Sequence, residues 1–143
     1  MNVIAFVIMA AATVFLLINW GNLPEQIPSH YNFRGEPDDY GGTGSLIFMM
    51  VIGWVLLLVM MILGKYPKYW NTGVTRTPAN EAVVNRITKD MLDIMEVSIA
   101  VLMAYMMVVP VRGTGMGIWF MPLFLAVIFG TIIVTAVRLI RNR

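Results

Sequence analysis

The sequence of 143 residues contains no cysteine and only one histidine. The lack of cysteine excludes disulfides, thiolate metal sites and thiol catalysis. The single histidine, His30, is too little for a structural zinc site, which takes four nitrogen or sulfur ligands. Charged residues are also scarce, at 13% of the chain against about 25% in ordinary soluble domains. Nothing in the sequence indicates a cofactor.

Hydrophobic residues, by contrast, make up 59% of the chain, and the mean hydropathy is +0.77. A soluble chain of this length could not bury so much apolar surface, so the excess must face a lipid bilayer. We therefore predict an all-α membrane protein with a single domain, residues 1–143, built as a four-transmembrane-helix bundle. The predicted spans are residues 3–20, 46–64, 91–110 and 118–140.

The first span, residues 3–20, could be a retained helix or a cleaved signal peptide. No lysine or arginine precedes Val3, and bulky residues precede Gly21, so we expect a retained helix and not a cleaved signal peptide.

The third span belongs to a longer predicted helix. At its start, Thr77 is a good N-cap and Pro78 a good first helical residue. Apolar residues then recur at helical spacing, first opposite polar ones and later in a continuous apolar run. This pattern predicts one helix from residue 78 that protrudes from the bilayer or lies along it and ends at Pro110.

The cations predict the orientation. Four spans place both termini and the connector, residues 65–90, on one face, and the loop of residues 21–45 on the other. The first face holds eight cations: Lys65, Lys68, Arg76, Arg86, Lys89, Arg138, Arg141 and Arg143. The second holds Arg34 and Arg112 alone. By the positive-inside rule, both termini are cytoplasmic (N-in/C-in) and the loop is extracytoplasmic.

The outer loop contains prolines and glycines that restrict and turn the backbone, together with four bulky apolar residues. A disordered linker would not carry these apolar residues, so we predict an ordered cap over the outer mouth of the bundle. The bulky residues are Ile27, Tyr31, Phe33 and Tyr40.

The string LPEQIPSHYN at residues 23–32, followed by Gly35-Glu36-Pro37-Asp38 and Tyr40-Gly41, resembles the signature loop of the bacterial SdpI-like immunity-protein family. That family begins with a short membrane domain of unknown function. The resemblance covers the first two spans and, more weakly, the third. It implies a non-enzymatic, multi-pass protein of the bacterial plasma membrane that protects against, or senses, a secreted peptide or envelope stress.

In this interpretation the outer loop recognises a peptide ligand through His30, Asn32, Arg34 and Asp38. Oxygen ligands and a histidine could also bind a divalent cation or a ligand's amine. The alternative is that Asn32 and Asp38 only make turn bonds while His30 bonds a backbone carbonyl.

A second polar group lies on the third helix, where Asp90, Asp93 and Glu96 are spaced three apart. Glu96 precedes an apolar run, where an unpaired charge is costly, so a possible intramembrane polar site at Asp93 and Glu96 could handle protons or cations. This reading makes the protein a small transporter or ion-conducting bundle. The alternative is interfacial pairing of Arg86 with Asp90, or of Lys89 with Asp93.

Other classes find little support in the sequence. Ser29 and Ser45 lack a base with an orienting partner, which argues against an enzyme. The cations are dispersed as membrane flanks, which argues against nucleic acid. The pairs Ala100/Ala104 and Ala126/Gly130 would let spans three and four pack or dimerise, if their spacing is not chance. A protein partner, a homo-oligomer, or a role as an accessory subunit of a larger membrane complex stays open.

Overall fold

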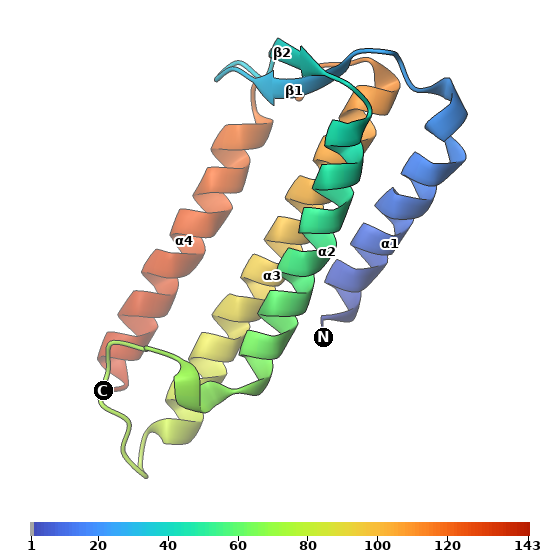
Figure 1. Ribbon diagram of the computed structural model, residues 1–143. Helices are drawn as coiled ribbons and strands as arrows, with labels where there is room; N and C mark the ends of the chain where they lie inside the picture. Colours follow the sequence, from blue (N-terminus) through green and yellow to red (C-terminus); the bar gives the residue numbers. More distant parts are fainter. Residues whose placement is uncertain (1) are drawn as a thin grey trace.

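The computed structural model describes residues 2–143 and consists of long helices with one β-hairpin at an end (Figure 1). The polar loop between the first two helices forms the hairpin. The helices are α1 (Val3–Ile18), α2 (Gly44–Lys65), α3 (Glu81–Arg112) and α4 (Phe120–Arg141), the strands are β1 (Ile27–Tyr31) and β2 (Pro37–Gly41), and two short 3-10 helices are η1 (Trp20–Asn22) and η2 (Pro67–Tyr69).

Helix α3 is the centre of the bundle, because α1, α2 and α4 all pack against it. The core lies where α1, α2 and α3 meet, and α4 stands on the other side of α3 (Figure 1). Helix α1 contributes one residue per turn to this core. The buried core residues are Ala5, Met9, Ala12, Leu16, Ile27, Leu46, Leu57, Ala100 and Met107.

Three helices, α2, α3 and α4, are long and apolar enough to cross a membrane. Helix α1 is equally apolar but has only 16 residues, because it ends at Ile18 and not at the predicted residue 20. The side-chain amide of Asn19 donates to the carbonyl of Phe15 at 2.8 Å and closes the last turn. The chain then continues as η1.

Two expectations for the third helix were wrong. The helix begins at Glu81 and not at Pro78, because residues 77–80 form a turn in which Thr77 O accepts from Asn80 N at 3.1 Å. It also does not end at Pro110, which lies buried within the last turn. Near a C-terminus a proline removes few helical bonds, and the helix stops only at Gly113, which has the left-handed φ of 63°.

Within the predicted outer loop the structure shows two antiparallel strands, which the sequence did not predict. Ile27 pairs with Gly41 and Tyr31 with Pro37, with register irregularities in between. Ile27 is fully buried and anchors the hairpin's base in the core. The hairpin lies across the end of the bundle at which α2 begins and α3 ends (Figure 1).

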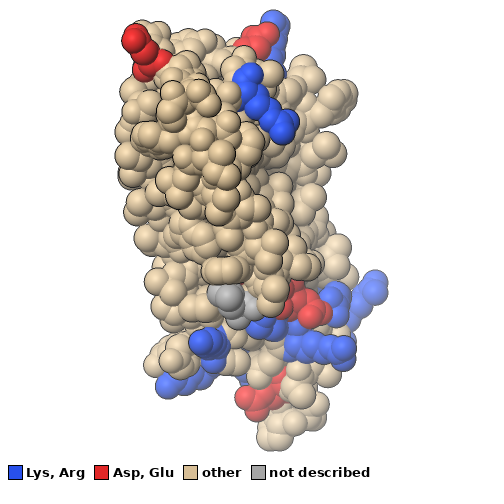
Figure 2. All heavy atoms as spheres, turned by 90° about the vertical axis from the view of Figure 1, so that its right-hand side faces the viewer, with Lys and Arg blue, Asp and Glu red and all other residues tan. Residues whose placement is uncertain are grey.

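Charged side chains gather at the two ends of the molecule, and a broad uncharged band lies between them on the face that Figure 2 shows. Large apolar side chains on α1, α2 and α4 are exposed along this length. Such a band is what a lipid bilayer requires of the protein it surrounds. The protein is therefore a helical membrane protein.

Candidate functional site

The hairpin brings His30 and Asp38 together across its two strands. The His30 Nδ1 and Asp38 Oδ1 atoms are 2.6 Å apart, and the side chains are 68% and 43% exposed. Beside this pair, the Ser29 hydroxyl donates to Asp39 Oδ2 at 3.1 Å. Because the pair is open to solvent, a ligand could contact both partners without displacing other side chains.

Asn32 organises the turn at the hairpin's tip. Its Oδ1 accepts the backbone N–H groups of Arg34 at 2.8 Å and Glu36 at 3.1 Å, and its Nδ2 donates to Glu36 Oε2 at 3.1 Å. These bonds form the Asx-type turn that an asparagine makes with residues two and four ahead of it. The amide of Asn32 is thus engaged within the turn, while Arg34 is exposed.

The hairpin's tip is docked on the turn between α3 and α4. Met116 N donates to Gly35 O at 2.8 Å. Gly35 has a φ of +74°, and a Cβ at this position would lie 2.9 Å from Gly117 O. Only glycine fits both the left-handed backbone and this close approach. The hairpin is therefore held at its tip as well as at its base.

The exposed aromatic residue at the tip was not predicted as a site residue. Phe33 is 96% exposed, and Trp119, on the neighbouring turn between α3 and α4, is 73% exposed. The only sign in the sequence that Phe33 would be exposed was its position between Asn32 and the turn residue Gly35. Both side chains are therefore accessible on the outer surface of this end of the molecule.

Tyr31 points inward from the hairpin. Its hydroxyl is buried and has no hydrogen-bond partner among the described residues. Burial raises the pKa of this phenol, and the neighbouring phenols of Tyr40 and Tyr105 raise it further. The hydroxyl of Tyr105 is instead satisfied, because it donates to Met116 O at 2.7 Å.

No metal site is evident in residues 2–143, since no three His, Asp or Glu side chains lie close enough together to hold an ion. The structure joins His30 to Asp38 and Asn32 to Glu36, while the Arg34 side chain makes no hydrogen bond or ion pair with these residues.

The acidic residues of α3 differ in their surroundings. Asp93 pairs with Lys89, and Asp90 Oδ2 lies 3.5 Å from Arg138 Nη1 of α4 and not beside Arg86. Glu96 is only 4% exposed, and no described residue hydrogen-bonds to its carboxyl group. The structure therefore separates Glu96 from the paired interfacial acids.

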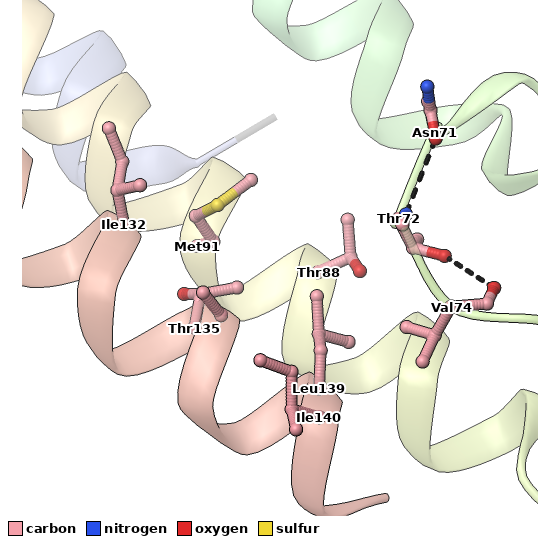
Figure 3. Close-up of a pocket in the computed structure, with 11 residues that line it drawn as sticks. Asn71, Thr72, Val74, Thr88, Met91, Ile132, Thr135, Leu139 and Ile140 are labelled. Atoms are coloured by element: carbon pink, nitrogen blue, oxygen red, sulfur yellow. Dashed lines mark hydrogen bonds between the residues drawn. The ribbon is translucent and has the colours of Figure 1, made fainter. Parts of the chain in front are cut away.

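A pocket of about 320 Å³ lies at the opposite end from the hairpin, between the 71–74 segment and helices α3 and α4 (Figure 3). Apolar side chains such as Met91 and Leu139 form most of its wall. Its hydroxyls are largely engaged, since Thr88 donates to Val84 O at 2.9 Å and Thr72 to Val74 O at 3.3 Å. No charged residue lines it.

Comparison with known proteins shows similarity over part of the chain. A distant relative is an uncharacterized protein of Archaeoglobus fulgidus, 26% identical over 107 residues, which cover 64% of this chain and 57% of that protein. The chain thus spans a little over half the length of this relative. No solved structure matches. Neither description names an immunity protein, so that role stays a prediction. Residues 7–63, which run from α1 through the hairpin into α2, match the family described as domain of unknown function DUF1648.

Proposed function

We propose that this protein is a non-enzymatic protein of the bacterial plasma membrane whose outer hairpin recognises a secreted peptide, or senses envelope stress, as in SdpI-like immunity proteins. In this proposal the protein crosses the membrane four times, with both termini in the cytoplasm. The hairpin is the recognition surface, and the helical bundle is its support.

Two features support the proposed four-span topology: the length of α1 and the distribution of cations between the two ends of the bundle. Helix α1, with 16 residues at about 1.5 Å each, is about 24 Å long, somewhat short of the roughly 30 Å hydrocarbon core. The amide of Asn2 donates to Asp93 O at 3.2 Å, so α1 begins level with the Lys89–Asp93 pair on α3. A bilayer thins slightly around a short span at modest cost. The eight cations at this end favour a cytoplasmic position.

The observation that carries the proposal is the double anchoring of the hairpin. Ile27 fixes its base and Gly35 fixes its tip, so the backbone that carries the exposed His30–Asp38 pair and Phe33 is held in a set position. Preorganised groups lose little conformational entropy when a ligand binds. The two-stranded sheet also has unpaired outer edges, to which an extended peptide can add as a further strand.

A protection assay tests the proposal. Cells that express the protein are challenged with a panel of secreted antibacterial peptides, and survival is compared with that of cells carrying an empty vector. We expect protection against at least one peptide, and we expect the double variant His30→Ala, Asp38→Ala to lose it. Glu25→Gln, which is exposed in the same loop, is the matched control and should protect as well as the wild type.

The outcome counts against the proposal if no peptide in the panel is resisted, or if the double variant protects fully while it reaches the membrane in normal amounts.

An accessory-subunit role is tested separately by mass measurement after purification in mild detergent. A companion protein at constant stoichiometry would favour that role over stand-alone recognition.

A further inference from the structure

Glu96 faces a cavity of about 190 Å³ where α1, α2 and α3 meet. The cavity is lined by Phe6 of α1, by Trp54, Leu57, Leu58 and Met61 of α2, and by Glu96 of α3. Glu96 is the only charged residue in this wall. Since Glu96 lies about one helical turn beyond Asp93, the cavity lies next to the charged end of the bundle and extends from there into the uncharged band.

The carboxyl group of Glu96 has no protein partner among residues 2–143. The one nearby polar group in the cavity wall, the indole N–H of Trp54, donates to Thr13 Oγ1 at 3.0 Å. An ionised carboxylate surrounded by apolar groups is costly unless a positive charge accompanies it. The cavity therefore favours an occupant that brings a cation to Glu96.

The other wall groups select the kind of cation. Phe6 and Trp54 meet edge to face, with ring centroids 5.4 Å apart and an interplanar angle of 67°. Aromatic rings with a carboxylate are the groups that bind quaternary ammonium ions. A calcium or magnesium ion instead needs about six oxygen ligands, and this wall offers a single carboxylate.

The route into the cavity also points to a lipophilic ligand. Phe6 and Leu58 line the cavity and are at the same time exposed on the outer surface of the bundle. They belong to α1 and α2, which pack against each other less closely than each packs against α3. The mouth of the cavity thus opens between two apolar helices toward lipid, and a ligand that enters there must first dissolve in the bilayer.

We infer that the cavity at Glu96 binds a small lipophilic organic cation, of the size and chemistry of an alkyl or benzyl ammonium ion. Glu96 supplies the counter-charge, and Phe6 and Trp54 supply ring contacts. The site is separate from the outer hairpin, so it does not depend on the proposed function.

Binding of benzyltrimethylammonium to the purified full-length protein in lipid nanodiscs, measured by calorimetry, tests this inference. We expect a Kd of about 1 mM or tighter for the wild type. Glu96→Gln should weaken binding by about tenfold or more, as loss of a desolvated charge pair does. Asp93→Asn is the matched control on the same helix and should bind as the wild type does.

Two further measurements keep the test decisive if Glu96→Gln does not fold. Neopentylbenzene, the uncharged carbon isostere of the probe, should fail to compete with it. Leu58→Trp, which leaves Glu96 intact and fills the mouth, should abolish binding. The inference is overturned if the wild type does not bind the probe, if Glu96→Gln binds it equally well, if the neutral isostere competes fully, or if Leu58→Trp has no effect.

Discussion

The carbonyl oxygen of Gly35, at the hairpin's tip, accepts a hydrogen bond from the backbone N–H of Met116, on the turn between α3 and α4. This bond joins the tip of the outer hairpin to the second half of the chain, as Ile27 joins its base through the shared core. The link depends on a close approach of two backbones, since Gly115 and Gly117 also lie against Gly35.

Gly35→Ala should undo this docking. A side chain there would sit in a left-handed conformation, at a cost of about 1–2 kcal/mol, and would also meet the carbonyl of Gly117. We expect faster hydrogen exchange at the Met116 amide and a lower thermal midpoint in detergent. Gly42→Ala, where a Cβ meets nothing within 4 Å, is the control and should leave both unchanged. Equal exchange in the two variants would contradict the docking.

Gly53 of α2 lies against Met9 of α1 and Met103 of α3. A Cβ at Gly53 would lie 2.7 Å from Met9 Cε, the flexible end of a side chain, and 3.2 Å from Met103 Cβ, which has less room to move. Gly53→Ala should therefore destabilise the bundle by about 1 kcal/mol, after the helix-propensity gain of alanine is counted. Gly130→Ala on α4 meets nothing within 4 Å and should stabilise by up to about 1 kcal/mol through helix propensity. Thermal unfolding of both variants, side by side, measures the difference. If both shifts have the same sign, this account of Gly53 is wrong.

Tyr31→Phe should be neutral or stabilising. The buried hydroxyl has no partner, and a polar group left unsatisfied costs about 1–3 kcal/mol. Because burial raises the pKa of Tyr31 in the folded state, the protonated form is favoured by folding. Stability should thus be unaffected below pH about 10 and fall as pH rises through the raised pKa.

Absorbance of phenolate and thermal midpoints, measured between pH 8 and pH 12, test the Tyr31 prediction. In Tyr31→Phe a phenol that ionises later than an ordinary tyrosine should be missing, and the loss of stability above pH about 10 should be smaller. A variant that titrates and unfolds like the wild type at every pH would show that Tyr31 is not the shifted group.

The cysteine-free chain allows a direct measurement of orientation. Single cysteines are introduced at Gln26, beside β1, and at Asn142, after α4. A membrane-impermeant maleimide added to intact cells should label the first and not the second, and after lysis both should react. Labelling of the Asn142 position alone in intact cells would reverse the proposed topology.

The helices were largely predictable because apolar runs of this length have few alternatives in a short chain. Their ends depend on local bonds that the sequence only suggests, as at Asn19 and Asn80, where side chains set the last or first turn. The hairpin was missed because its strands contain Pro28 and Pro37, which argue against strands by propensity alone. An ordered segment was expected, but its pairing depends on contacts with the bundle.

The pairing of the charged residues on α3 could also be predicted only in part from the sequence. The Lys89–Asp93 pair could be predicted, because residues four apart share a helix face. The partner of Asp90, Arg138, lies 48 residues along the chain and could not. Likewise Ala100 was expected to serve packing between the third and fourth spans, but it lies in the core with Ala5 and Met9 of α1. Which face of a central helix meets which neighbour is a property of the assembled bundle.

The segment that matches DUF1648 shares its core with the part of the chain that follows it. Residues 7–63 hold α1, the hairpin and most of α2, but α3 supplies Ala100 and Met107 to the core that these elements share. The backbone partner of the hairpin's tip also lies outside this stretch. A fragment cut at residue 63 would therefore expose the inner surface of α1 and release the hairpin at one end.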